Sequence, residues 1–177
     1  MKYDNTGRRE QSEENKRKIA AAAIALINER GYDGVSVEEI TKAAGVSKGA
    51  FYIHFKSKED LIEREIKIFY DDLKSDASLP KAERLRFFLE NSINHIKKSG
   101  LKTAQQWFSH SVRGSFYGKS KLNYDIRAVA EILGDEKEAK EAVSVYYGAL
   151  NLWCFTDGGV DPAAIVSDYI KRSVKND

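Results

Sequence analysis

Hydrophobic positions repeat at helical spacing along most of the 177 residues of the chain. Apolar residues recur three and four positions apart, whereas strand-like runs are absent. Both prolines, Pro80 and Pro162, stand where a helix can begin, and there the missing N–H of proline costs nothing. The pattern therefore predicts an all-α fold of about nine helices.

A helix-turn-helix motif is predicted over residues 36–55. Ser36 and Glu39 have the spacing of a capping box, which marks the start of a short helix. Gly45 can take the left-handed conformation that ends this helix, and Ser47 can cap the next one. Two short helices joined by a glycine turn are the form that this DNA-binding motif takes.

The remaining helices complete two predicted domains. A flexible arm over residues 1–11 and a first helix from Ser12 to Gly31 belong with the motif in an N-terminal three-helix domain, residues 1–56. A linking helix opens a C-terminal helical domain for ligand binding and dimerisation, residues 57–177. The other helices expected in that domain lie at about 80–98, 101–113, 119–133, 136–156 and 161–175.

Overall charge does not argue for nucleic-acid binding, because 29 basic and 27 acidic residues leave a net charge of only +2. The distribution of charge is more informative. Between positions 42 and 58 there are four basic residues and no acidic one: Lys42, Lys48, Lys56 and Lys58. Such a focused positive patch is the electrostatic footprint that phosphate binding requires.

The second helix of a helix-turn-helix enters the major groove with its N-terminus first. The residues expected to face base edges are therefore Ser47, Lys48, Gly49 and Ala50. Lys48 can donate to guanine, and the two small residues that follow it permit a close approach to the groove. Backbone contacts are predicted for three residues on the neighbouring helices, namely Ser36, Lys42 and Lys58.

The same stretch of sequence resembles the DNA-binding region of the tetracycline-repressor (TetR) family of bacterial regulators. The resemblance lies within residues 19–66 and includes GYDGVSVEEITKAAGVSKGAFYIHFKSKEDL. It implies that Tyr52 and His54 contact phosphates. It also implies a homodimer that represses transcription from a double-stranded DNA operator until a small-molecule inducer releases it. The rest of the chain resembles the family only in helical content and length.

The last two predicted helices carry more apolar surface than one domain needs, which predicts a two-fold dimer in which four helices pack together. The residues expected at the dimer interface are Val145, Gly148, Ala149, Leu152, Ile165 and Tyr169. Two copies of the helix-turn-helix related by a two-fold axis predict a palindromic operator.

Aromatic residues are frequent in the second half of the chain, and pockets between helices of a bundle are common small-molecule sites. The residues expected to line an inducer pocket, against the alternative that they only fill the core, are Trp107, Tyr117, Tyr146 and Trp153. The segment 113–124 is expected to be a loop that gates this pocket, and its Arg113 is a candidate partner for an acidic ligand.

Other classes of function find less support. The sequence has no G-x-S-x-G elbow, P-loop or dinucleotide fingerprint, so we expect no enzyme activity and no cofactor. A single cysteine, Cys154, and three dispersed histidines predict no metal site. No apolar run approaches the roughly 20 residues of a membrane span, and the N-terminus lacks the apolar core of a signal peptide, which predicts a cytoplasmic protein without a membrane partner. The remaining alternative is a helical dimer that acts through protein–protein contacts without specific DNA binding.

Overall fold

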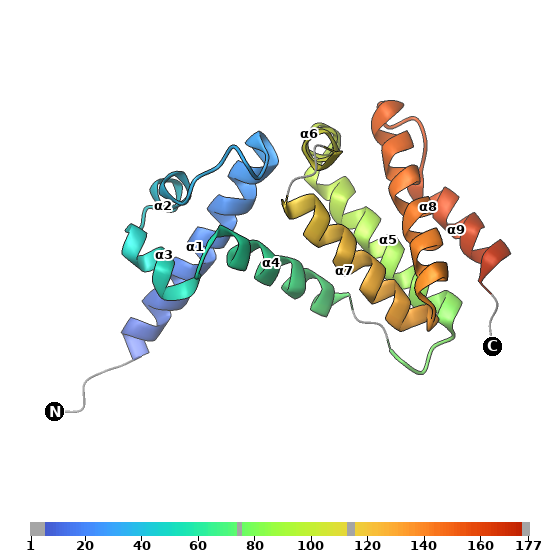
Figure 1. Ribbon diagram of the computed structural model, residues 1–177, viewed down its shortest axis with the longest axis horizontal. Helices are drawn as coiled ribbons and strands as arrows, with labels where there is room; N and C mark the ends of the chain where they lie inside the picture. The colour runs from blue at the N-terminus through green and yellow to red at the C-terminus, as the bar shows by residue number, and fades with distance from the viewer. Residues whose placement is uncertain (1–5, 74–75, 113–115, 175–177) are drawn as a thin grey trace.

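The computed structural model describes residues 6–73, 76–112 and 116–174. These described residues form nine helices and no strand, which confirms the predicted all-α fold (Figure 1). The helices are α1 (Thr6–Arg30), α2 (Val37–Ala44), α3 (Lys48–His54), α4 (Lys58–Asp72), α5 (Lys81–Ser99), α6 (Leu101–Val112), α7 (Phe116–Leu133), α8 (Glu136–Phe155) and α9 (Pro162–Ser173).

Local capping fixes the helix-turn-helix as the sequence predicted. The Ser36 hydroxyl accepts from the backbone N–H of Glu39 at 3.2 Å, and the Glu39 carboxylate accepts from the backbone N–H of Ser36 at 2.9 Å. Gly45 ends α2 in the left-handed conformation, with φ of 67°. The Ser47 hydroxyl then caps α3 by accepting from the backbone N–H of Ala50 at 3.1 Å. The start and direction of α3 are therefore set by short-range contacts.

The three N-terminal helices pack around buried side chains that belong to the same hydrophobic cluster as the core of the C-terminal helices. α1 contacts both α2 and α3. Ile19 of α1, Ile40 of α2 and Phe51 of α3 are fully buried. Burial of these side chains holds the helix-turn-helix against α1, so α3 is presented on a rigid support.

The C-terminal helices form a bundle in which α8 packs against α7 and α9, and α9 packs against α5 (Figure 1). α4 runs from the N-terminal domain into this bundle and contacts α7, while α6 contacts α1. The ring of Tyr32, which follows α1, also lies 5.4 Å from the ring of Phe116 at the start of α7. The two domains therefore touch at several points besides the linking helix.

Two predicted segments differ from the structure. α1 begins at Thr6 rather than at Ser12, so residues 6–11 of the predicted flexible arm are helical, and residues 1–5 lie outside the described part of the chain. A side-chain hydrogen bond from Gln11 to Asn15 and ion pairs such as Arg17–Glu14 link successive turns of this polar helix.

The predicted gating loop over residues 113–124 is wrong from residue 116 onward, because α7 begins at Phe116. Gly118, which suggested a loop, instead allows α7 to approach α6 closely. A Cβ atom at this position would lie 3.0 Å from the Cβ of Ser111. Arg113, the proposed partner of an acidic ligand, lies outside the described residues.

Candidate nucleic-acid interface and ligand cavity

The outward face of α2 and α3 carries most of the residues predicted to contact DNA. Phe51 and Phe55 turn inward and are buried. The predicted contact residues that are exposed are Ser36, Lys42, Ser47, Lys48, Gly49 and Tyr52, whereas Ala50 and His54 are half-buried. The helix that the motif places in the major groove therefore exposes Lys48, Gly49 and Tyr52.

Ile53 is a residue of this surface that sequence reasoning missed. Its side chain is 77% exposed on α3, which is unusual for an isoleucine. An apolar side chain on a groove-facing helix is suited to the methyl group of thymine. The signal was available in the sequence, because Ile53 lies midway between the buried Phe51 and Phe55 and so points away from the core.

Lys48 forms an ion pair with Glu38 of α2 in the DNA-free chain. The pair raises the pKa of Lys48 and lowers that of Glu38. The acid-free stretch of sequence does not reveal this contact, because Glu38 precedes the stretch and reaches Lys48 across the turn. Both side chains are exposed, so the pair is screened by solvent and Lys48 can exchange its partner.

Lys58 is placed differently from the phosphate contact that we predicted. Its ammonium donates to the backbone carbonyls of Tyr32 and Val35, both at 2.6 Å, and lies 3.9 Å from the centre of the Tyr32 ring. Burial lowers the pKa of Lys58. The ammonium is therefore engaged in holding the start of α4 to the loop between α1 and α2, and we leave Lys58 out of the DNA-contacting set.

A cavity of about 390 Å³ lies between α1 and α4 on one side and α5, α6 and α7 on the other. Trp107 and Tyr117, two of the residues expected to line an inducer pocket, line this cavity. Tyr146 and Trp153 do not: Tyr146 is fully buried and Trp153 nearly so, and both belong to the core. α8 is apolar on most of its surface, so its pattern could not separate side chains that fill the core from side chains that reach a cavity.

A buried polar network lies beside this cavity. Lys121 of α7 forms an ion pair with Asp125 at 2.9 Å, and their side chains are 10% and 1% exposed. The hydroxyls of Tyr70 and Tyr147 also donate to the Asp125 carboxylate. Burial together with the charge of Asp125 raises the pKa of Tyr70. The network ties α4 to α7 and α8 in the middle of the domain.

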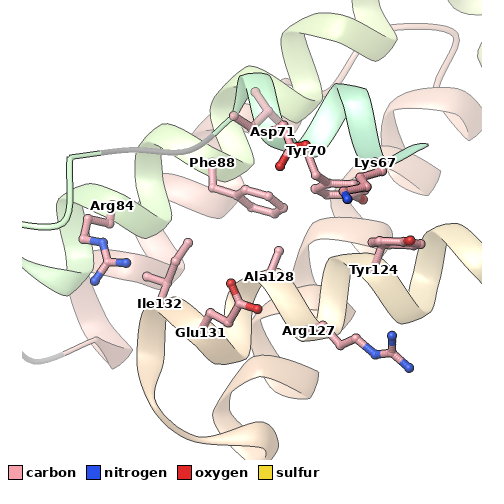
Figure 2. Close-up of a pocket in the computed structure, with 11 residues that line it drawn as sticks. Lys67, Tyr70, Asp71, Arg84, Phe88, Tyr124, Arg127, Ala128, Glu131 and Ile132 are labelled. Atoms are coloured by element: carbon pink, nitrogen blue, oxygen red, sulfur yellow. The ribbon is translucent and has the colours of Figure 1, made fainter. Parts of the chain in front are cut away.

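Tyr70 also separates this cavity from a second one of about 420 Å³, because it lines both. Figure 2 shows the second cavity, with Arg84 and Ile132 at one end and Lys67 and Tyr124 at the other. The Tyr70 ring stacks between those of Phe88, at 5.6 Å, and Tyr124, at 5.7 Å. A single side chain of the linking helix therefore forms a wall of two cavities.

Comparison with known proteins identifies the N-terminal domain. Residues 19–64 match the family model described as bacterial regulatory proteins, tetR family. The chain belongs to the TetR family. This confirms the resemblance seen in the sequence.

Two curated relatives of this TetR-family chain are regulators from Bacillus subtilis (strain 168). The uncharacterized HTH-type transcriptional regulator YwcC is 58% identical over 41 residues, which are 23% of this chain and 18% of YwcC. The uncharacterized HTH-type transcriptional regulator YuxN is 33% identical over 139 residues, which are 71% of this chain and 48% of YuxN. The chain thus spans less than half the length of these two relatives.

The fold of the TetR-family chain extends over both domains of a solved relative. Thermus thermophilus FadR, a TetR-family transcriptional repressor solved in complex with lauroyl-CoA, superposes with a TM-score of 0.62. The two chains are 18% identical, and the match covers 92% of this chain and 96% of that one. Within the described residues of our chain, none of the helices combines the length and apolar character that a membrane span needs.

The residues predicted at a dimer interface of this TetR-family chain lie mostly at the surface of α8 and α9. Gly148 and Leu152 are exposed, and Val145, Ile165 and Tyr169 are half-buried. Ala149 is a correction, since it is only 1% exposed and packs inside its own chain. Phe155 was missed by the sequence analysis, although it ends α8 with 84% of its surface exposed.

Proposed function

We propose that this chain is a sequence-specific transcriptional repressor that binds a palindromic operator as a homodimer and is released by a small-molecule effector. The observation that carries the proposal is the exposure of Lys48 in the first turn and of Ile53 in the last turn of α3, a capped helix that packs against α1. Lysine can donate hydrogen bonds to guanine, and isoleucine can make an apolar contact with the thymine methyl group. The two residues therefore provide both hydrogen-bonding and apolar contacts to bases.

Dimerisation is supported by the exposed Leu152 and Phe155 of α8, together with the half-buried Ile165 and Tyr169 of α9. Exposed apolar side chains that gather on one surface commonly mark a protein–protein interface. A two-fold axis near these helices would relate two copies of α3, and two such reading heads require an operator with inverted half-sites.

Release by an effector is supported by where the 390 Å³ cavity lies. Its walls include Ile24 and Asn28 of α1 as well as Trp107 and Tyr117 of α6 and α7. A ligand in this position contacts the DNA-binding domain directly. It lowers DNA affinity when it binds more tightly to an arrangement of the domains whose two α3 helices no longer match successive grooves.

The experiment that tests this function is selection of bound sequences from a random double-stranded DNA pool with the purified protein. We expect an inverted repeat whose half-sites contain guanine and thymine. Lys48→Ala and Ile53→Ala should each relax discrimination at a different position of the half-site, at a cost of about 1–3 kcal/mol per position. Lys102→Ala, which removes an exposed lysine on α6, is the matched control and should leave the selected sequence unchanged.

Recovery of no specific sequence by a folded dimer would reject this function. It would favour instead a helical dimer that acts through protein–protein contacts. Salt dependence separates the two cases, because binding to DNA weakens steeply as salt rises.

A further inference from the structure

Glu65 is a half-buried carboxylate in the wall of the 390 Å³ cavity. Burial raises its pKa, and the charge that opposes this effect comes from Lys16. Lys16 is itself 4.0 Å from Glu13, so its attraction is shared. Within the described part of the chain, no hydrogen bond or salt bridge to the Glu65 carboxylate is seen. A carboxylate that is partly removed from water without a close partner gains from a cation brought into the cavity.

Lys121, the cationic residue of the same cavity, does not supply that partner. Its ammonium already has three acceptors: the two carboxylate oxygens of Asp125 at 3.2 and 2.9 Å, and the Tyr70 hydroxyl at 3.3 Å. Its three N–H bonds are therefore used, and its charge is offset by that of Asp125. His95, which also lines the cavity, has its pKa lowered by burial and by the charges of Lys121 and Lys98, which favours its neutral form. The unbalanced charge of the cavity is that of Glu65.

The rest of the lining suits an aromatic or aliphatic body. Phe69 lies one helical turn after Glu65 on α4, with its ring 4.6 Å from that of His95. Trp107 and Tyr117 meet edge to face at 6.3 Å on the side formed by α6 and α7. Aromatic faces attract cations, and the volume of about 390 Å³ lies within the usual range for small-molecule sites.

We propose that the effector of this chain is a lipophilic cation, whose positive charge binds Glu65 and whose apolar body fills the cavity toward Trp107 and Tyr117. The proposal rests on the proposed function for its regulatory meaning, but the binding itself does not depend on DNA. It excludes fatty acids and other lipophilic anions as preferred ligands of this cavity, since they would place a second negative charge beside Glu65.

Two probes of nearly the same shape and opposite charge test the proposal: tetraphenylphosphonium and tetraphenylborate. Calorimetric titration of the full-length protein without DNA should show tetraphenylphosphonium binding at least about tenfold more tightly than tetraphenylborate. Glu65→Gln should reduce the affinity for tetraphenylphosphonium about tenfold and leave that for tetraphenylborate equal or improved. Glu63→Gln is the matched control, because Glu63 is exposed on the same helix and outside the cavity wall. It should change neither affinity.

Equal binding of both probes, preference for the borate, or loss of phosphonium affinity in the Glu63 variant as well would overturn the proposal. Failure of the proposed repressor function would give a different result from failure of the cation proposal. In that case tetraphenylphosphonium binds in a manner that depends on Glu65, yet no operator is selected. Conversely, an operator could be selected while Glu65→Gln leaves the affinity for tetraphenylphosphonium unchanged. That result would support the repressor function and reject the proposal that Glu65 binds a cationic effector.

Discussion

Replacement of Lys58 by methionine distinguishes a structural lysine from a DNA-contacting one. Lys58→Met keeps an unbranched side chain that can still lie against Tyr32, but it removes the ammonium. The backbone carbonyls of Tyr32 and Val35, which belong to buried residues, then lose the donor that lies 2.6 Å from each. A buried polar group left without a partner costs about 1–3 kcal/mol.

Because Lys58 is only half-buried, water can reach part of this site and replace some of the lost hydrogen bonding. We therefore expect a loss of about 2 kcal/mol in the free energy of unfolding for the two carbonyls together. For a chain of this size that corresponds to a decrease in Tm of about 4–8 °C. Calorimetry or circular dichroism during heating measures this decrease, with the same protein concentration for each variant because the Tm of the proposed dimer would depend on concentration.

Lys56→Met is the control, since Lys56 is exposed two positions earlier in the chain and its substitution removes the same charge. Its stability should stay within about 0.5 kcal/mol of the original protein. The structural role of Lys58 is refuted if Lys58→Met has the same Tm as Lys56→Met and instead weakens binding to all DNA sequences. In that case the slope of log affinity against log salt concentration would fall by about one unit. That outcome would restore the phosphate contact predicted from the sequence.

Two further predictions concern the C-terminal domain. Glu65 has a raised pKa in the folded chain, so the ionised carboxylate costs stability above that pKa and the cost vanishes below the unfolded value of about 4.3. Glu65→Gln should therefore raise the unfolding free energy at pH 7 but not near pH 4, as measured by urea unfolding at both pH values; an equal gain at both would contradict the electrostatic cause. Asp125→Ala leaves the buried Lys121 ammonium and two phenols without their acceptor, which should lower the free energy of unfolding by about 3–5 kcal/mol. The double variant Lys121→Met with Asp125→Leu should recover most of that loss. A single variant as stable as the original protein would show that the network is not closed to water.

The sequence predicted those features that neighbouring residues determine. The capping box at Ser36 and the left-handed Gly45 follow from residue types a few positions apart, so the helix-turn-helix and the place of Lys48 could be predicted. Family resemblance added that this motif reads DNA. The start of α1 could not be predicted in this way, because a polar helix start carries no apolar pattern.

Contacts between segments distant in the sequence could not be predicted in the same way. Lys58 carries the same charge as Lys42, yet only the folded chain shows that Lys58 meets two backbone carbonyls. Tyr146 and Trp107 are both aromatic residues in helical patterns, and only the packing of α8 shows that Tyr146 fills the core while Trp107 reaches the cavity. No pattern in the sequence distinguishes Glu65 from the other glutamates of α4. Only the folded chain shows that its carboxylate lies half-buried in the cavity wall, without a hydrogen bond or salt bridge among the described residues.

The ion pair between Lys48 and Glu38 has a consequence for how such a protein would search a genome. A regulator meets an enormous excess of random DNA before it meets its operator, and its time on those sites is governed by attraction to phosphates alone. While Lys48 remains with Glu38, its charge is cancelled at the surface that approaches the duplex first, and Glu38 repels the backbone. Under the proposed function, a guanine positioned for Lys48 compensates for breaking the pair, whereas a random sequence does not. The pair would therefore shorten the residence time on random DNA. Glu38→Gln would be expected to lengthen that residence time more than it lengthens the residence time on the operator.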